Sequence, residues 1–166
     1  MSSPADHTSD AVFAIDLTTG EVNWIYQATV GDAWNTACDT RTPQSCPEEN
    51  GPDFDFGAGT MLVTIDSNRQ LVVAGQKSGD VHAVNPDTGE LVWKTRVGRG
   101  GIQGGVHFGM AASDSQVFVP INDMNNTRNG DYLDPVEAKP GLHSLRVNDG
   151  SVVWNHVQEN VCAPNK

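Results

Sequence analysis

Charged side chains at two places in this 166-residue sequence could take part in catalysis. Lys77 lies at the end of a predicted central strand, directly before Ser78-Gly79. A cation held there could stabilise negative charge that develops on an oxygen; the alternative is a solvated lysine in a hairpin turn. Asp6 and Asp10 lie just before the first sequence repeat, and either carboxylate could act as a general base. The alternative is a solvated acidic tail, and Asp10 is favoured over Asp6 because it adjoins a predicted strand.

A polar–aromatic pair stands in the glycine-rich stretch 98–109. His107 and Phe108 follow several glycines, which let a backbone approach a ligand or a neighbouring element closely. The pair could therefore face a bound ligand. The alternative is a hydrogen-bonded histidine and a packed phenylalanine on an inner strand.

The sequence contains no complete set of metal ligands. Asp53 and Asp55 alternate around Phe54, so both carboxylates would face one side of a strand and could approach calcium. The sequence favours a simpler interpretation, in which they cap turns and accept hydrogen bonds from backbone amides. Zinc and c-type haem are not expected, because there is no CxxC motif and no Cys/His cluster.

The three cysteines leave two interpretations open. Cys38 and Cys46 bracket a short polar loop that could close as a local disulfide, which would leave Cys162 without a partner. The alternative is three free thiols in a reducing compartment.

Composition and charge exclude several classes of partner. The chain has 10 Lys+Arg against 21 Asp+Glu, a formal net charge of −11 and no basic block, so neither a nucleic acid nor an anionic membrane surface is expected to bind. The longest apolar runs are five or six residues, far short of the roughly 20 that cross a bilayer. Residues 1–7 contain neither the basic nor the apolar region of a secretion signal, so none is expected in the chain as it stands.

One eleven-residue pattern occurs three times and predicts the elements that carry these side chains. The copies span residues 14–24, 83–93 and 144–154. Each copy reads as an alternating strand, a tight turn that ends in glycine and a second strand that ends in tryptophan. We interpret the repeated tryptophans, Trp24, Trp93 and Trp154, as packing residues. Trp34 lies off the pattern and could line a pocket.

The repeat spacing predicts the architecture. With the insertions at 33–52 and 124–139 left out, the three tryptophans are 49 and 45 residues apart. A period of about 40–50 residues with several short strands is typical of a β-propeller blade. Two further predicted strands precede the second copy (61–66 and 71–76), and two precede the third (106–112 and 116–121).

We therefore predict an all-β fold of antiparallel four-stranded propeller blades, about two and a half of them in an open, partial propeller. Residues 1–30 hold an N-terminal tail and the last two strands of a first blade. Residues 31–98 hold the insertion with the cysteine loop and the second blade, 99–159 the third blade, and 160–166 a C-terminal tail. Because propellers have four to eight blades, we expect this to be a piece of a longer propeller.

The repeat resembles the tryptophan-docking motif of alcohol dehydrogenases that depend on pyrroloquinoline quinone (PQQ), the quinoproteins, in which the tryptophan packs between neighbouring blades. Residues 32–35 and 51–58 are similar to the segment that follows a docking tryptophan in these enzymes. Residues 74–85 resemble the strand and turn that carry a cofactor-contacting Lys or Arg. Together with the cysteine loop, these segments are most similar to polyvinyl-alcohol dehydrogenase-like proteins.

The resemblance implies roles for the candidate residues. Lys77 would donate a hydrogen bond to the quinone carbonyls, and His107 and Phe108 would face the cofactor, where relatives more often carry Asn-Trp. Asp10 or Asp6 would be the catalytic base beside a Ca²⁺ ion. The parent protein would be periplasmic, would oxidise an alcohol such as a polyvinyl-alcohol-like secondary alcohol, and would pass electrons to a cytochrome c-type acceptor. The isolated segment would be inactive, and it would need the missing blades or self-associate.

A second function remains open from the sequence. PQQ-like propellers that bind no quinone share the tryptophan repeat, so the chain could belong to a non-catalytic scaffold for protein interaction. Lys77 and the aspartate-rich segments before it favour the enzyme. The pair at 107–108 and the incomplete metal site favour the scaffold.

Overall fold

The computed structural model describes residues 5–39, 43–123 and 138–159. Within these residues the structure is almost entirely β, with two short 3-10 helices in the first insertion, η1 (Thr36–Asp39) and η2 (Pro43–Ser45). The strands, in chain order, are β1 (Ala11–Ile15), β2 (Val22–Gln27), β3 (Met61–Asp66), β4 (Arg69–Gly75), β5 (Asp80–Val84), β6 (Leu91–Arg96), β7 (Ala111–Ala112), β8 (Gln116–Ile121), β9 (Gly141–Arg146) and β10 (Val152–Val157).

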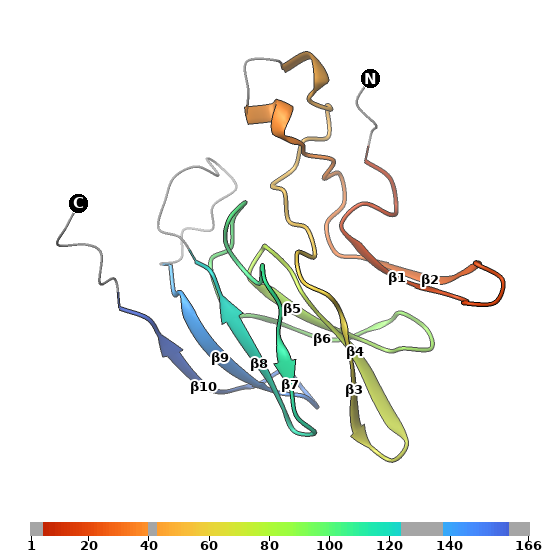
Figure 1. Cartoon of the computed structure of the whole chain (residues 1–166), viewed down its shortest axis with the longest axis vertical. Helices are drawn as coiled ribbons and strands as arrows, with labels where there is room; N and C mark the ends of the chain where they lie inside the picture. Colours follow the sequence, from red (N-terminus) through yellow and green to blue (C-terminus); the bar gives the residue numbers. More distant parts are fainter. Residues whose placement is uncertain (1–4, 40–42, 124–137, 160–166) are drawn as a thin grey trace.

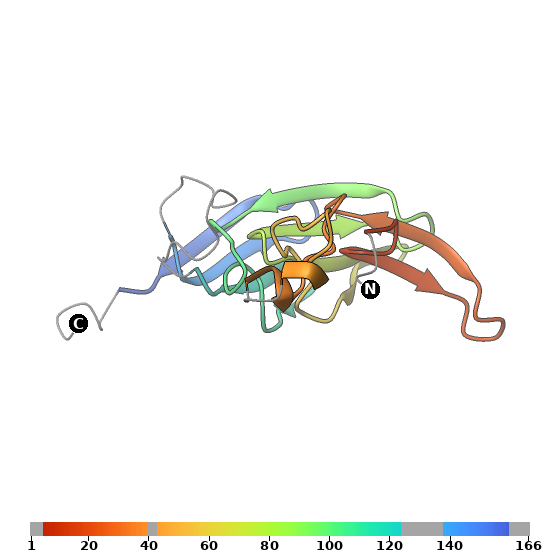
Figure 2. The same cartoon turned by 90° about the horizontal axis from the view of Figure 1, so that it is seen from above.

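The strands form three antiparallel sheets. β1 and β2 make a two-stranded sheet, and the two four-stranded sheets follow the chain order β3-β4-β5-β6 and β7-β8-β9-β10. The sheets lie in a row, with β1 and β2 at one end and β10 at the other (Figure 1). Seen from above, the row is thin and curved (Figure 2). The prediction of two and a half antiparallel four-stranded blades is confirmed.

The repeated hairpins close through the turn chemistry that the sequence predicts. In the first copy, the Asp16 carboxylate accepts hydrogen bonds from the backbone N–H groups of Thr18 and Thr19, both at 2.8 Å. The N–H of Gly20 then donates to the Asp16 carbonyl at 2.8 Å. Gly20 has a φ of 75°, a left-handed conformation that favours glycine.

The first strand of the third blade is shorter than predicted. The sequence suggests a strand over residues 106–112, but β7 contains only Ala111 and Ala112. Gly105 and Gly109 have φ values of 64° and 123°, which are incompatible with an extended strand. The segment between them turns instead, and the buried Val106 donates its backbone N–H to the carbonyl of Gln76 at 3.0 Å.

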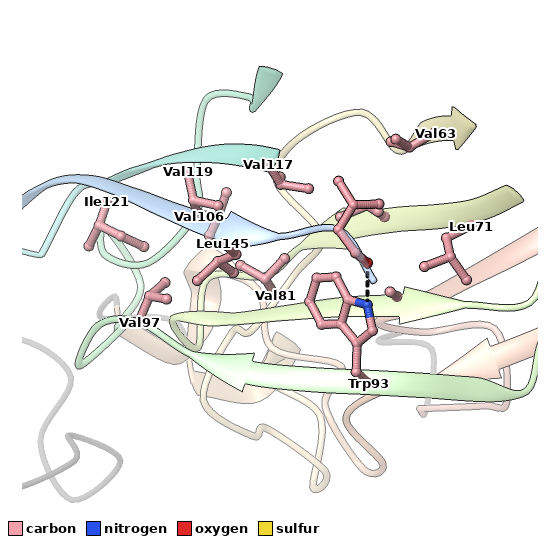
Figure 3. Packing of buried hydrophobic residues seen from close by; sticks show 13 residues of the cluster. Val63, Leu71, Val81, Trp93, Val97, Val106, Val117, Val119, Ile121 and Leu145 are labelled. Carbon is pink, nitrogen blue, oxygen red and sulfur yellow. Dashed lines mark hydrogen bonds between the residues drawn. The ribbon is translucent and has the colours of Figure 1, made fainter. Parts of the chain in front are cut away.

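The hydrophobic core lies between the second and third blades. Val73 and Val81 of the second blade and Val117, Val119 and Leu145 of the third are fully buried, since each has 0 % exposure. Figure 3 shows valine and leucine side chains of the two sheets packed against one another, with Trp93 at one side of the cluster. This face-to-face packing of alternate side chains is what two sheets need in order to stack.

The cysteine loop closes as the sequence allows. Cys38 and Cys46 form a disulfide with an S–S distance of 2.08 Å and a Cα–Cα distance of 4.7 Å, and it ties together the two 3-10 helices of the insertion. The third cysteine, Cys162, lies outside the described residues. Among the residues that the structure describes, no helix has the length and apolar character that crossing a membrane requires.

Candidate active site

Lys77 is the buried centre of an ion cluster. It follows β4 and is only 9 % exposed. Its Nζ lies 2.9 Å from Oδ2 of Asp53 and 2.6 Å from Oδ2 of Asp55. Residues 53–55 are not a strand, and Asp53 has a φ of 61°. The two residues therefore lie in a loop, as the favoured interpretation expected, and not on a strand. Their carboxylates both bind one ammonium group, however, and not the turn amides that the same interpretation expected.

Backbone contacts fix the position of Lys77 on both sides. Its N–H donates to the carbonyl of Asp55 at 3.0 Å, and its carbonyl accepts the N–H of Gly101 at 3.0 Å. A Cβ on Gly105 would collide with the Lys77 carbonyl, so that approach requires glycine. The glycine-rich stretch thus serves as the surface against which this lysine is held.

Asp32 is a site residue that sequence analysis did not select. It is 4 % exposed, and its Oδ2 accepts the backbone N–H of Phe54 at 3.0 Å. Its Oδ1 accepts the N–H of Trp34 at 3.3 Å. A Cβ on Gly51 would come within 2.9 Å of the Asp32 Cγ. Asp32 therefore joins the two ends of the insertion. Its place in the segment at 32–35, which resembles the segment that follows a docking tryptophan, was the one available signal.

Asp10 contributes a carboxylate from the first blade. It precedes β1 with a φ of 46°, and its Oδ2 is buried without a hydrogen-bond partner among the described residues. Burial, the charge of Asp32 and the neighbouring Asp55 raise the pKa of Asp10 to about 8. This carboxyl group can thus gain or lose a proton near neutral pH.

Lys77 acts differently on its two acidic partners. Burial raises the pKa of Asp53 to about 6, although the hydrogen bond from Lys77 opposes the change. Burial also acts to raise the pKa of Asp55, but the hydrogen bond and charge of Lys77 outweigh it and hold that pKa below its usual range. Burial lowers the pKa of Lys77, yet both carboxylates overcome this and raise it. The lysine is therefore cationic at neutral pH.

The predicted bases Asp6 and Asp10 line the same hollow, which has a volume of about 440 Å³. The wall also includes Asp32, Trp34 and Asp55, and Asp55 in turn binds the Lys77 ammonium group. Asp6 is exposed, and its Oδ1 accepts hydrogen bonds from the N–H and the hydroxyl of Thr8, which lower its pKa. Of the two candidates, Asp10 is the one with a buried, unpartnered oxygen and a raised pKa.

The structure does not place His107 and Phe108 in this hollow. They line a separate one of about 230 Å³ together with residues 120–122. Phe108 is 81 % exposed, and its ring centroid lies 4.5 Å from that of His107. The Nδ1 of His107 is buried without a partner within the described part of the chain.

The candidate site offers a carboxylate oxygen that could bind a cation and an ammonium N–H that could bind a carbonyl oxygen, but it is not a complete binding site for either ligand. Among the residues that the structure describes, no group of three or more His, Cys, Asp or Glu side chains could hold a metal ion. The unpartnered Oδ2 of Asp10 could supply one oxygen ligand to Ca²⁺. Lys77 uses two of its three N–H bonds on aspartates, which leaves one for a ligand.

Comparison with known proteins identifies relatives over almost the whole chain. A family model described as outer membrane protein assembly factor BamB matches residues 9–164. A polyvinylalcohol dehydrogenase from Pseudomonas sp. is 44% identical over 147 residues, which cover 88% of this chain and 21% of the relative. A polyvinylalcohol dehydrogenase from Sphingopyxis sp. (strain 113P3) is 33% identical over 150 residues, covering 89% of this chain and 22% of the relative.

A solved structure supports the fold. A europium-containing methanol dehydrogenase superposes with a TM-score of 0.56 at 13% identity, over 98% of this chain and 24% of that one. At this identity the likeness concerns the fold alone. The chain spans about a fifth of the length of the curated relatives it matches.

Proposed function

The chain belongs to the PQQ_2 family, whose model matches residues 9–164, and we propose that it is a segment of a PQQ-dependent dehydrogenase that oxidises an alcohol. The two curated relatives bear the name polyvinylalcohol dehydrogenase, which supports a dehydrogenase over other members of the family. The observation that carries the proposal is the ion cluster, in which Asp53 and Asp55 hold the Lys77 ammonium beside a hollow lined by Asp10.

Lys77 suits the electrostatic part of this reaction. When bound, PQQ supplies the acceptor for the hydride that leaves the alcohol carbon. A fixed ammonium group stabilises negative charge on an oxygen most effectively when it needs no reorganisation. Asp53 and Asp55 meet this condition because they hold Nζ at 2.9 and 2.6 Å.

Asp10 suits the proton-transfer part. Oxidation of an alcohol to a carbonyl compound removes the hydroxyl proton as well as the hydride. Asp10 would take that proton in its ionised form. In the metal-free chain its pKa is raised to about 8. Where Ca²⁺ is bound, Asp10 would be one of its ligands, and the ion's charge would lower this pKa and favour the ionised form that accepts a proton. His107 and Phe108 do not line the hollow that contains Asp10, so they would contact the cofactor from the separate hollow that they line.

The finer functional statements follow the relatives. We propose a secondary alcohol of the polyvinyl-alcohol type as substrate, a cytochrome c-type protein as electron acceptor and the periplasm as location. The disulfide between Cys38 and Cys46 supports an oxidising compartment.

Activity of the longer protein that carries this segment tests the function. After reconstitution with PQQ and Ca²⁺, it should reduce an artificial electron acceptor only when an alcohol is present. Asp10→Asn should lower kcat by about 10²–10⁴-fold, the usual contribution of a general base. Asp16→Asn, in the exposed first hairpin, should leave kcat unchanged. A folded protein with no alcohol-dependent reduction would instead favour the non-catalytic scaffold, which the BamB description of the family model keeps as the second candidate.

A further inference from the structure

A carboxylate of the third blade is buried among backbone N–H groups. Asp123 follows β8 and is 3% exposed. Its Oδ2 accepts the N–H of Arg99 at 2.6 Å and the N–H of Lys139 at 3.0 Å, and its Oδ1 accepts the N–H of Gly100 at 2.9 Å. Hydrogen bonds from backbone N–H groups to an ionised carboxylate are short and strong. Asp123 therefore holds the connection that follows β6 firmly in place.

Packing of the core brings Asp123 to this connection. Val97 and Ile121 precede the two sides of the contact by two residues each, and they lie at the same end of the hydrophobic cluster (Figure 3). A Cβ on Gly98 would come within 2.9 Å of both the Asp123 Oδ1 and the Ile121 Cγ2, so this close approach requires glycine. The contact thus joins the end of the second blade to the third blade.

The opposite side of the same connection contacts Lys77. The N–H of Gly101 donates to the Lys77 carbonyl at 3.0 Å. A Cβ on Gly100, which has a φ of 81°, would come within 2.7 Å of that carbonyl oxygen and would collide with the Ser78 carbonyl. Residues 99–101 therefore lie between Asp123 and Lys77 and contact both through their backbone.

Lys77 is held at its two ends by different segments of the chain. Its Nζ lies 2.9 and 2.6 Å from Asp53 and Asp55, in the loop before β3. Its carbonyl is bound by Gly101, which follows β6. A shift of the second segment would move the lysine backbone while the two carboxylates stay in place, so the N–H bond left for a ligand would change direction. A misplacement of about 1 Å can cost a catalytic group roughly a hundredfold in rate.

We propose that Asp123 is a positioning residue for the Lys77 ammonium group. It acts through the backbone of residues 99–101 and makes no contact of its own with the cofactor. The inference rests on the proposed function in one respect, since it takes the ligand of Lys77 to be the quinone. The third blade then contributes to the quinone site through Asp123, independently of the hollow lined by His107 and Phe108.

Hydrogen exchange tests the positioning without any cofactor. In the longer protein that carries this segment, Asp123→Ala removes the acceptor of three backbone N–H groups. Exchange at the Gly101 amide, whose acceptor is Lys77 and not Asp123, should then become at least about tenfold faster. Ser144→Ala is the matched control, because the buried Ser144 hydroxyl donates to the Gln116 Oε1 at 2.5 Å within the third blade. It should leave exchange at Gly101 unchanged.

Calorimetric titration of PQQ with Ca²⁺ into the same proteins tests the effect on the ligand. Asp123→Ala should weaken PQQ binding about three- to tenfold, the size expected for the loss of one hydrogen bond, and Ser144→Ala should not weaken it. In a Lys77→Met protein, Asp123→Ala should cause no further loss, because a residue that acts only through Lys77 then has nothing to position. A general loss of stability would instead weaken binding equally in both proteins.

A second substitution keeps the test decisive if the alanine variant does not fold. Asp123→Asn retains one acceptor oxygen. It should therefore change exchange at Gly101 and PQQ affinity in the same direction as Asp123→Ala, but by less.

Three results would overturn the proposal. They are unchanged exchange at Gly101 in a folded Asp123 variant, unchanged PQQ affinity in that variant, and a loss of affinity that is equally large in the Lys77→Met protein. A folded wild-type protein that binds no PQQ would refute the proposed function. Exchange at Gly101 would still decide whether Asp123 positions Lys77, so the two failures can be told apart.

Discussion

A lysine whose side chain is only 11% exposed, such as Lys77, costs free energy unless carboxylates stay ionised beside it. For Lys77, this condition is met by Asp53 and Asp55 at 2.9 and 2.6 Å. The more exposed of the two, Asp55, has a lowered pKa, while the buried Asp53 has a pKa raised to about 6. Lys77 therefore depends mainly on Asp55 for its counter-charge at low pH, and on both aspartates above pH 6.

Removing the Lys77 charge should destabilise the fold. Lys77→Met leaves two carboxylates without their cation, and breaking a buried ion pair in this way costs about 3 kcal/mol. Lys94→Met is the matched control, because Lys94 is half exposed and lies 3.6 Å from Asp80, a pair worth under about 1 kcal/mol. Free energies of unfolding from urea titration at pH 7 measure both losses. Equal losses would contradict a structural role for the Lys77 cluster.

Replacing Asp10 should stabilise the metal-free chain by an amount that grows as pH rises. The folded-state pKa of Asp10 is raised to about 8 from 3.8, so its protonated form favours folding, and this stability is lost progressively as pH rises from about 4 through 8. Asp10→Asn removes the ionisation. Its melting temperature should exceed that of the wild type at pH 9, and the difference should shrink toward pH 5.

The exposed Asp16 provides the contrast for that experiment. Its pKa is lowered by the backbone N–H groups of Thr19 and Thr18, so its ionised form favours folding. Asp16→Asn should therefore lower the melting temperature at pH 9. A difference between Asp10→Asn and the wild type that is the same at pH 5 and pH 9 would show that Asp10 titrates normally.

At the scale of elements, the insertion positions the acidic residues through one side chain. Asp32 accepts the backbone N–H groups of Trp34 and Phe54, which lie at opposite ends of the insertion. Phe54 stands between Asp53 and Asp55, the two partners of Lys77. The hydrogen bond from the Phe54 N–H to Asp32 therefore helps to position both carboxylates. Asp32 is in this sense a positioning residue.

Loss of the hydrogen bonds to Asp32 should make the backbone around Phe54 more mobile. Asp32→Ala should speed hydrogen exchange at the Phe54 amide by at least about tenfold and cost about 1–3 kcal/mol of stability, the usual cost of leaving buried donors unpaired. Asp32→Asn keeps an acceptor oxygen and should have a smaller effect. Asp39→Ala, in the exposed part of η1, should change neither quantity. Unchanged exchange at Phe54 in Asp32→Ala would contradict the positioning role.

The junction between the first two blades should weaken in acid. His82 is buried, its Nδ1 lies 2.8 Å from the Tyr26 hydroxyl, and Phe56 contacts its ring edge to face. Burial lowers the pKa of His82 to about 4, with Asp80 raising it and Lys94 lowering it. In the unfolded chain His82 binds a proton below about pH 6.5, whereas in the folded chain it does so only below about pH 4. Stability therefore falls as pH drops from about 6.5 to about 4.

The size of this effect follows from the shift in pKa. It amounts to roughly 3 kcal/mol at pH 4, at 1.36 kcal/mol for each pKa unit. Unfolding free energies at pH 7 and pH 4.5 should therefore differ less in His82→Gln than in the wild type. His156→Gln, on the exposed strand β10, should keep the wild-type difference. An unchanged pH dependence in His82→Gln would exclude His82 as its source.

The regular elements could be predicted from the sequence because each depends on local pattern. The hairpins follow from repeated turn residues, and the predicted strands at 61–66 and 116–121 have the observed bounds. The short length of β7 could not be predicted, because Gly105 and Val106, which precede it, turn to contact the backbone of Gln76 and Lys77. The convergence of Asp53 and Asp55 on Lys77 was missed for a related reason. It joins residues more than 20 positions apart through a loop that has no periodic pattern.

For the whole molecule, the candidate site lies where the first blade, the insertion and the second blade meet. Asp10 comes from the first blade, Asp32 and Asp53 flank the insertion, and Lys77 comes from the second blade. Sequence analysis chose Asp10 and Lys77 through the family motif, but it could not show that they belong to one acidic cluster. The separate hollow of His107 and Phe108 likewise depends on the course of the glycine-rich stretch, which resemblance alone does not determine.

The central claim is a quinone site built around Lys77, and calorimetric titration of PQQ with Ca²⁺ into the longer protein that carries this segment tests it most directly. We expect saturable binding at one site per chain, weakened at least about tenfold by Lys77→Met and largely retained by Lys77→Arg, which keeps the cation. Lys94→Met should bind like the wild type. Absence of saturable binding by a folded protein, or equal binding by Lys77→Met, would contradict the claim and leave a propeller scaffold.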